Sequence, residues 1–192
     1  MADPVAVSGA SLLSPAVQSH FERAGLQIDG VCAGLSRYGL QWRQTAALLE
    51  DLSAEEADAL GEMMPLVRAR AGQALITEGD VGDWMLLLLG GTVDVIKASQ
   101  HGEVSRLAVI RQGAAVGEMS MLDAAPRYAT CVAIGDVQAG VLTRPVIARL
   151  IRDHPAIGAK LLVKLTQLLA QRLRNTSNQL VKLLQRHEPA DD

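Results

Sequence analysis

Between residues 66 and 143 the chain alternates short apolar runs with turns that are rich in Gly, Asp and Glu. Short runs that carry Val, Ile, Leu and Thr between such turns predict β-strands. Residues 92–95, Thr-Val-Asp-Val, alternate polar and apolar side chains, which is the period of a half-buried strand. Many short strands at regular spacing predict a small antiparallel barrel or sandwich. The predicted strands cover residues 66–71, 74–77, 84–89, 92–97, 106–110, 128–134 and 137–143.

Helical patterns lie on both sides of these strands. Ser53 and Glu56 have the spacing of a capping box, which predicts a helix that begins there and runs to about residue 64. Residues 143–152 predict a second, short helix. Pro155 is well placed as the first residue of a third helix, which can continue to about residue 187.

The long helix predicted over residues 155–187 would extend about 50 Å and carries an apolar seam. Such a seam is unfavourable when it is exposed to water along an isolated helix. We therefore expect the seam to pack on the β-rich region at one end and on a second copy of the chain at the other, as a parallel homodimer. We interpret its basic flanks as a solvated face, with a surface for nucleic acid or membrane as the alternative. The seam comprises Leu162, Leu165, Leu169, Leu173, Thr176, Leu180 and Leu183, and the basic residues are Lys160, Lys164, Arg172, Arg174, Lys182 and Arg186.

The N-terminal segment is harder to interpret. Its helical pattern over residues 15–25 and 33–50 is broken by glycines, so we expect short helices, and no motif indicates their role. We expect three parts: a helical segment of residues 1–51, a β-rich domain of residues 52–154, and a long helix with a short acidic tail over residues 155–192.

Composition narrows the class of protein. The chain has 192 residues, of which 49% are hydrophobic and only 3% aromatic, so aliphatic side chains must build the core. A net charge of −3 gives no general electrostatic footprint for nucleic acid. We see no signal peptide and no apolar run long enough to span a bilayer. Cys32 and Cys131 are far apart in the sequence, which favours two buried thiols in a reducing cytoplasm.

The residues that are best suited to bind a ligand lie within residues 116–133. Gly117 has no Cβ, so the backbone there can approach a ligand closely. Glu118 opens a one-turn helix predicted over residues 118–122 and can accept hydrogen bonds from ribose hydroxyls. The start of that helix offers unpaired N–H groups to an anion.

The second half of this stretch carries a cation. Arg127 is a planar fork that fits the two free oxygens of a phosphodiester. Pro126 stiffens the turn that presents it, and Ala129 leaves its backbone amide accessible. The alternative is a buried ion pair between Arg127 and Glu118 in a domain that has lost its ligand.

Taken in order, these residues resemble the phosphate-binding cassette of the cyclic-nucleotide-binding domain of bacterial catabolite activator proteins and protein kinase A regulatory subunits. The family pattern is approximately Phe-Gly-Glu-(apolar)-Ala-Leu, a short loop, then Pro-Arg-x-Ala-Thr-Val-x-Ala. Here residues 116–122 are Val-Gly-Glu-Met-Ser-Met-Leu and residues 126–133 are Pro-Arg-Tyr-Ala-Thr-Cys-Val-Ala. With the order of predicted strands, the resemblance extends over residues 52–175. It implies a mainly β fold with flanking helices, namely an antiparallel, jelly-roll-like β-roll. The ligand residues that it implies in this stretch are Gly117, Glu118, Met119, Ser120, Arg127, Tyr128 and Ala129.

In this family a residue of the long helix, from the same or the partner chain, lies over the purine. Catabolite activator proteins carry Ala-Arg-Arg-Leu-x-x-Thr-Ser there, and residues 170–177 are Ala-Gln-Arg-Leu-Arg-Asn-Thr-Ser. The motif lies about one turn, or about 5 Å, further from Pro155 than the family pattern places it. Counting without a gap instead puts Arg172 over the base. Arg172 therefore fits both counts, as the residue over the base or as a partner for Glu118, whereas Thr176 fits one. Thr176 would equally suit a residue that sets the register of a dimer.

The resemblance implies a bacterial, cytoplasmic cyclic-nucleotide receptor. Family members that prefer cyclic GMP often carry Thr or Ser directly after the arginine, whereas Tyr128 stands here, which favours cyclic AMP over cyclic GMP. The ligand would be the nucleotide, without a metal or other cofactor. The receptor would dimerise through residues 155–187 and signal to an unidentified effector protein.

Other functions fit less well. Catabolite activators follow the long helix with a helix-turn-helix domain, whereas residues 188–192 are a short acidic tail, so we expect no direct DNA binding and no membrane association. A transcription regulator of the Crp/Fnr type would need a partner. A third hypothesis is a ligand-free interaction module with a degenerate β-roll. We expect no enzyme, because the four histidines are scattered and no nucleophile or phosphate-loop motif is present.

Overall fold

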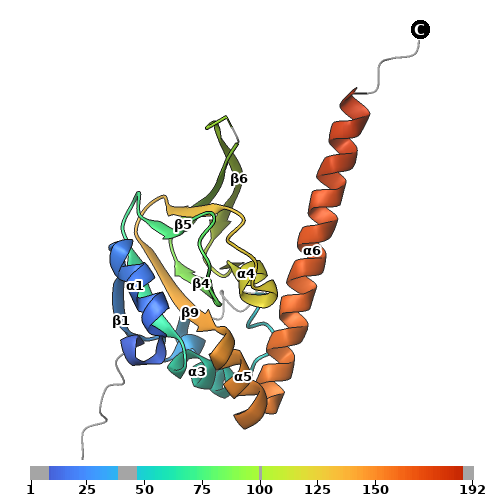
Figure 1. Ribbon diagram of the computed structural model, residues 1–192. Coiled ribbons are helices and arrows are strands. Elements are labelled where there is room, and N and C mark those ends of the chain that lie inside the picture. Colours follow the sequence, from blue (N-terminus) through green and yellow to red (C-terminus); the bar gives the residue numbers. More distant parts are fainter. Residues whose placement is uncertain (1–8, 39–46, 100, 188–192) are drawn as a thin grey trace, which may run out of the picture.

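The computed structural model describes residues 9–38, 47–99 and 101–187 (Figure 1). Its centre is a β-roll of two sheets, in which every pairing among the described strands is antiparallel. The five-stranded sheet has the order β1-β2-β9-β4-β7, and the four-stranded sheet has the order β3-β8-β5-β6. The predicted mainly β fold with flanking helices is therefore confirmed. The strands are β1 Gln27–Val31, β2 Pro65–Ala69, β3 Ala74–Ile76, β4 Trp84–Gly90, β5 Thr92–Ala98, β6 Val104–Arg111, β7 Ala115–Val116, β8 Thr130–Ala133 and β9 Val137–Thr143.

Strand β4 separates two apolar cores. Because successive side chains of a strand point to opposite faces, Leu86 and Leu88 enter the core inside the roll, while Met85 and Leu87 enter the core beneath the helices. All four side chains are fully buried. The continuous apolar run of residues 84–89 thus belongs to a strand that is covered on both faces.

Three helices cover the outer face of the five-stranded sheet. α3 (Ala54–Glu62) begins with the predicted capping box, in which the Ser53 hydroxyl accepts from the Glu56 amide at 3.2 Å and the Glu56 carboxylate accepts from the Ser53 amide at 2.8 Å. α5 (Arg144–Asp153) is capped by Thr143 and leads into α6 (Pro155–His187). α5 and α6 both lie where the sequence pattern predicts them.

The N-terminal segment contains a strand that the sequence pattern did not predict. It consists of the 3₁₀ helix η1 (Gly9–Leu12), α1 (Pro15–Arg23), β1 and the 3₁₀ helix η2 (Leu35–Tyr38). β1 pairs with β2 at the edge of the five-stranded sheet, so this segment is part of the roll's surface. The sequence Gln-Ile-Asp-Gly-Val is short and mostly polar, and the free edge of β2 supplies the hydrogen bonds that make it a strand. Residues 39–46 of the stretch 33–50, where short helices are predicted, lie outside the described part of the chain.

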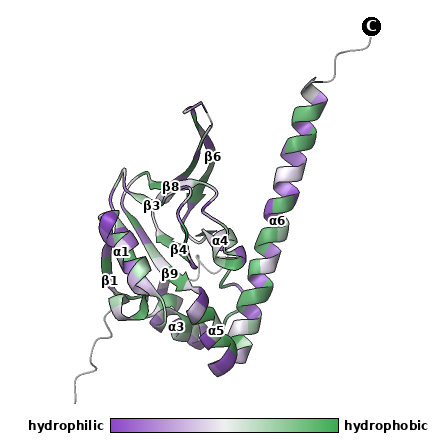
Figure 2. Ribbon diagram, viewed as in Figure 1, coloured by the Kyte–Doolittle hydropathy of each residue, from purple (hydrophilic) through white to green (hydrophobic). Residues whose placement is uncertain are grey.

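α6 runs past the roll and ends far from it (Figure 1). Leu165 is buried and Leu162 and Leu169 are half-buried, whereas Leu173 and Leu180 are 69% and 56% exposed. Apolar residues recur along the whole helix (Figure 2). The seam therefore packs on the domain only over its first half.

The basic face of α6 is not simply solvated, and that interpretation is wrong for its first half. Lys160 forms an ion pair with Glu56 at 2.6 Å. Lys164 is 9% exposed and lies 2.8 Å from Glu50 and 3.0 Å from Asp51. These contacts fasten α6 to α3 and to the segment before it, and they depend on an approach between residues over 100 positions apart.

The two cysteines are buried and unpaired, as expected. Burial raises the pKa of the Cys32 and Cys131 thiols to about 12, so neither is a reactive thiolate near neutral pH.

Candidate functional site

The site begins where β7 turns into a short helix. Gly117 has a φ of +82°, a left-handed conformation that side chains disfavour, and it precedes α4 (Glu118–Asp123). A Cβ at Gly117 would lie 2.8 Å from Nη1 of Arg127 and 2.9 Å from Cδ1 of Ile76. The glycine is thus required both by the backbone and by the close approach of Arg127. The helix predicted over residues 118–122 is confirmed.

Arg127 is held in a cage of backbone carbonyls. Its Nη1 donates to the Gly117 carbonyl at 2.7 Å and its Nη2 donates to the Trp84 carbonyl at 2.6 Å. The guanidinium carbon lies 4.3 Å from the centroid of the Trp84 ring, a cation–π geometry. The residue is 3% exposed, and this burial lowers the pKa of its guanidinium.

No carboxylate of the described residues lies within ion-pair distance of Arg127. A guanidinium has five N–H groups, and two of them point at the Gly117 and Trp84 carbonyls, which leaves three for another acceptor. A buried cation without an ion-pair partner is costly, and a bound anion would relieve that cost. The alternative ion pair between Arg127 and Glu118 is not formed.

Glu118 pairs with the long helix instead. Its side chain is fully buried, one carboxylate oxygen accepts from Nη1 of Arg172, and Nη2 of Arg172 donates to the Ala115 carbonyl at 2.7 Å. Burial raises the pKa of the Glu118 carboxyl, while Arg172 and the nearby Arg127 oppose that rise. The other oxygen, Oε2, is buried and has no hydrogen-bond partner among the described residues. An unpaired buried acceptor of this kind is a place where a ligand hydroxyl can donate.

Gly82 and Trp84, two residues that sequence reasoning missed, complete the cage around Arg127. A Cβ at Gly82 would lie 2.8 Å from Nη2 of Arg127 and 2.8 Å from Nε1 of Trp84. Gly82 and Gly117 therefore both allow close approach to Arg127. The sequence signals were present, as a Gly-Asp turn before β4 and a tryptophan at its start, but their pattern indicates only a turn followed by a strand.

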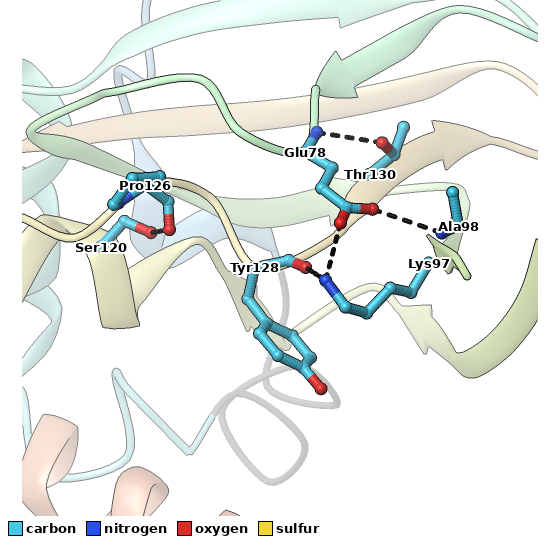
Figure 3. A network of polar contacts seen from close by, with 7 residues as sticks. All are labelled: Glu78, Lys97, Ala98, Ser120, Pro126, Tyr128 and Thr130. Carbon is cyan, nitrogen blue, oxygen red and sulfur yellow. Dashed lines mark hydrogen bonds and ion pairs between the residues drawn. The ribbon is translucent and has the colours of Figure 1, made fainter. Parts of the chain in front are cut away.

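The other predicted residues of this stretch differ in exposure. Ser120 is 4% exposed and its hydroxyl donates to the Pro126 carbonyl at 3.4 Å, so it closes the loop between α4 and β8 (Figure 3). Ala129 is 8% exposed, whereas Met119 and Tyr128 are 46% and 60% exposed. Met119 and Tyr128 thus present apolar surface beside the buried polar groups.

Tyr128 takes part in a polar network that sequence reasoning also missed (Figure 3). The Lys97 ammonium lies 4.2 Å from the centroid of the Tyr128 ring and donates to the Tyr128 carbonyl at 2.7 Å and to Glu78 at 2.6 Å. The Glu78 amide in turn donates to the Thr130 hydroxyl at 3.0 Å. The hydrogen bond with Lys97 lowers the pKa of Glu78.

The long helix contributes one of its two predicted site residues. Arg172 reaches Glu118, whereas Thr176, about one turn further along α6, is exposed to solvent. Among the described residues, no three His, Cys, Asp or Glu side chains lie close enough together to hold a metal ion. None of the helices in the described ranges is long and apolar enough to cross a membrane.

Comparisons with known proteins agree with this geometry. The model of the cyclic nucleotide-binding domain family matches residues 66–154. A crystal structure of a cyclic nucleotide-binding domain from Methylobacillus flagellatus KT is 33% identical, with a TM-score of 0.70, over 82% of this chain and 88% of that one. The catabolite activator protein of Thermus thermophilus is 31% identical, with a TM-score of 0.65, over 71% of this chain and 62% of that one.

A curated relative is similar over a comparable region. The CRP-like cAMP-activated global transcriptional regulator of Mycobacterium tuberculosis is 27% identical over 139 residues, which are 72% of this chain. The match spans 60% of the regulator's length. Fold, motif and relatives all point in one direction, and the chain belongs to the cyclic-nucleotide-binding domain family.

Proposed function

We propose that this chain is a bacterial, cytoplasmic receptor for cyclic AMP that dimerises through α6 and signals to a partner protein. The observation that carries the proposal is that two buried polar groups of the site each lack a partner among the described residues. Within the described part of the chain, Arg127 is a buried cation without a carboxylate at ion-pair distance, and Glu118 keeps a buried oxygen without a donor. A cyclic nucleotide supplies both missing partners, since it has an anionic phosphodiester and a ribose hydroxyl.

The roles of the residues follow from their chemistry. The remaining N–H groups of Arg127 would donate to the phosphate oxygens, and the unpaired Glu118 oxygen would accept from the ribose hydroxyl. Gly117 has no side chain and Ala129 has only a methyl group, so neither would cover the backbone amides near the phosphate. Arg172 already contacts Glu118 and would lie beside the sugar or over the base.

Two observations support cyclic AMP as the preferred nucleotide. Tyr128 stands directly after Arg127, and its hydroxyl lies at the far end of a ring that is 60% exposed. It therefore does not present a hydroxyl close to the backbone, as Thr or Ser would. The regulator of M. tuberculosis is described as cAMP-activated, which supports the same ligand here.

The second half of α6 supports a dimer. Leu173, Leu180, Val181 and Leu184 are each at least half exposed, on a helix that has left the domain surface. The same helix of a second copy of the chain would bury these residues by coiled-coil packing, which an apolar stripe along a helix favours. Because Glu118 is bonded to Arg172 on α6, a nucleotide that binds at Glu118 would shift the position or stability of this helix, and an effector protein would sense that change.

A regulatory role fits the family better than catalysis, because cyclic-nucleotide-binding domains are typically non-enzymatic. Transcriptional regulation through a DNA-binding partner is the second candidate, favoured by the similarity to the M. tuberculosis regulator. A mobility-shift assay with random duplex DNA at low salt, with and without nucleotide, distinguishes it: binding by the chain alone would contradict the need for a partner.

The proposed ligand is tested by calorimetric titration of protein that has been stripped of nucleotide by unfolding and refolding. We expect tighter binding of cyclic AMP than of cyclic GMP. Arg127→Ala removes two charge-assisted hydrogen bonds worth roughly 1.5–3 kcal/mol each, so its affinity should fall by about a hundredfold or more.

Arg111→Ala is the matched control, because Arg111 is an exposed arginine on β6 that makes none of the contacts of Arg127. Its affinity should equal that of the wild type. Undiminished binding by a folded Arg127→Ala variant would contradict the site, and an absence of heat with both nucleotides would contradict the receptor.

A further inference from the structure

α1 packs against the side of the cage that holds Arg127. Phe21 is fully buried, and its ring centroid lies 4.9 Å from that of Trp84 in an edge-to-face arrangement. The His20 ring lies 5.3 Å from the same indole. Trp84 also carries the Arg127 guanidinium at 4.3 Å. One tryptophan ring thus contacts both the N-terminal helix and the proposed phosphate-binding arginine.

His20 has a second connection to Arg127, through the backbone. Its Nδ1 lies 3.3 Å from a carboxylate oxygen of Asp80, and its Nε2 lies 3.2 Å from the Leu75 carbonyl. The Asp80 carbonyl accepts from the Arg127 amide at 2.8 Å, and the Gly79 amide donates to the Arg127 carbonyl at 2.9 Å. The turn that His20 holds is therefore the turn to which the Arg127 backbone is bonded.

These contacts restrain both the side chain and the backbone of Arg127. Trp84 fixes the plane of the guanidinium, and the turn at residues 79–80 fixes the backbone from which that side chain extends. The His20 side chain is only 12% exposed and contacts both supports. A side chain that is already held in its binding geometry loses less conformational freedom when the ligand arrives, so its supports contribute to affinity.

We propose that His20 is a positioning residue for Arg127, and that α1 thereby sets the affinity of the nucleotide site. The inference rests on the proposed function, and it gives the N-terminal helix a role. Loss of the His20 ring would free the Trp84 indole and the Asp80 turn, and Arg127 would then sample orientations that do not face the phosphate. Contacting residues in one network commonly couple strongly enough to change an equilibrium roughly three- to thirtyfold.

The first test needs no nucleotide. The ¹H–¹⁵N resonance of the Arg127 side chain, assigned with an Arg127→Lys variant, reports the ring current of Trp84. We expect His20→Ala to move this resonance and Ser19→Ala to leave it in place, because Ser19 is an exposed neighbour on the same helix. His20→Phe keeps a ring against Trp84 but loses both polar contacts, and we expect an intermediate shift.

The second test is titration with cyclic AMP. His20→Ala should weaken binding roughly three- to thirtyfold, whereas Ser19→Ala should bind as the wild type does. If His20 acts through Arg127, the same substitution should cost much less affinity in an Arg127→Lys background. A residue that only stabilises the fold would cause the same loss in both backgrounds.

The outcomes are distinct. A folded His20→Ala variant with wild-type affinity and an unmoved Arg127 resonance would overturn the inference, as would equal losses in the two backgrounds. If His20→Ala does not fold, His20→Phe decides by the same two measurements. If the wild type binds neither nucleotide, the proposed function fails, while the resonance still decides whether α1 positions Arg127.

Discussion

Replacing Arg172 by alanine would leave the fully buried Glu118 carboxylate without its ion-pair partner. Burial already raises the pKa of Glu118, and Arg172 is the strongest of the groups that oppose this rise. In the variant the pKa of Glu118 should therefore rise further. The carboxyl then either stays charged in a dry site or takes up a proton on folding.

The size of the effect can be bounded. Protonation limits the penalty, since each pH unit above the ordinary pKa of 4.5 costs about 1.4 kcal/mol. The loss of unfolding free energy from this source is then at most about 3.5 kcal/mol at pH 7 and about 1.4 kcal/mol at pH 5.5. For a chain of this length, about 3.5 kcal/mol corresponds to a fall of roughly 7–14 °C in Tm.

The direction of the pH dependence follows from proton uptake. A carboxyl whose pKa is higher in the folded state binds more protons there than in the unfolded state. The variant should therefore lose stability as the pH rises above 4.5, until the pH passes the raised pKa of the folded state. Urea unfolding of the wild type and the variant at pH 5.5 and pH 7 measures this difference.

Arg174→Ala is the matched control, because Arg174 lies on the same helix, is exposed, and among the described residues donates a hydrogen bond only to Gln171, at 3.1 Å. It should leave stability unchanged at both pH values. Adding Glu118→Gln to Arg172→Ala should remove the excess pH dependence. A loss of stability in Arg172→Ala that is equal at pH 5.5 and pH 7 would refute the reasoning.

Three further outcomes are expected. Gly117→Ala strains a φ of +82° and places a Cβ 2.8 Å from Nη1 of Arg127. The affinity for cyclic AMP, measured by calorimetry, should therefore fall about tenfold or more. An unchanged affinity would contradict the close approach of Arg127 to Gly117. Leu180→Asp should convert a dimer to a monomer in sedimentation analysis, and a dimer that persists would place the contact elsewhere. Lys164→Met removes the pairs with Glu50 and Asp51, so the urea midpoint should fall, less so at high salt, where ion pairs already contribute less.

Much of the candidate site could be predicted from the sequence because its residues lie close together along the chain. Gly117, Glu118 and Arg127 fall within eleven consecutive residues, and each carries its chemistry in its residue type. The same sequence offered two cations as partners for Glu118, Arg127 and Arg172. Arg127 is nearer along the chain, but Arg172, 54 residues away, makes the contact. The choice depends on how α6 lies across the roll.

The sequence by itself determined the elements whose signals are local. The capping box at Ser53, the apolar run of β4 and the short helix that begins at Glu118 each depend on neighbours within a turn or two. Only the tertiary structure decided that residues 27–31 form a strand, that Lys160 and Lys164 face carboxylates, and that Trp84 lies between α1 and Arg127. These features join segments from about 30 to over 100 residues apart, and such contacts form only where the packing of the two sheets and α6 brings the groups within a few ångströms.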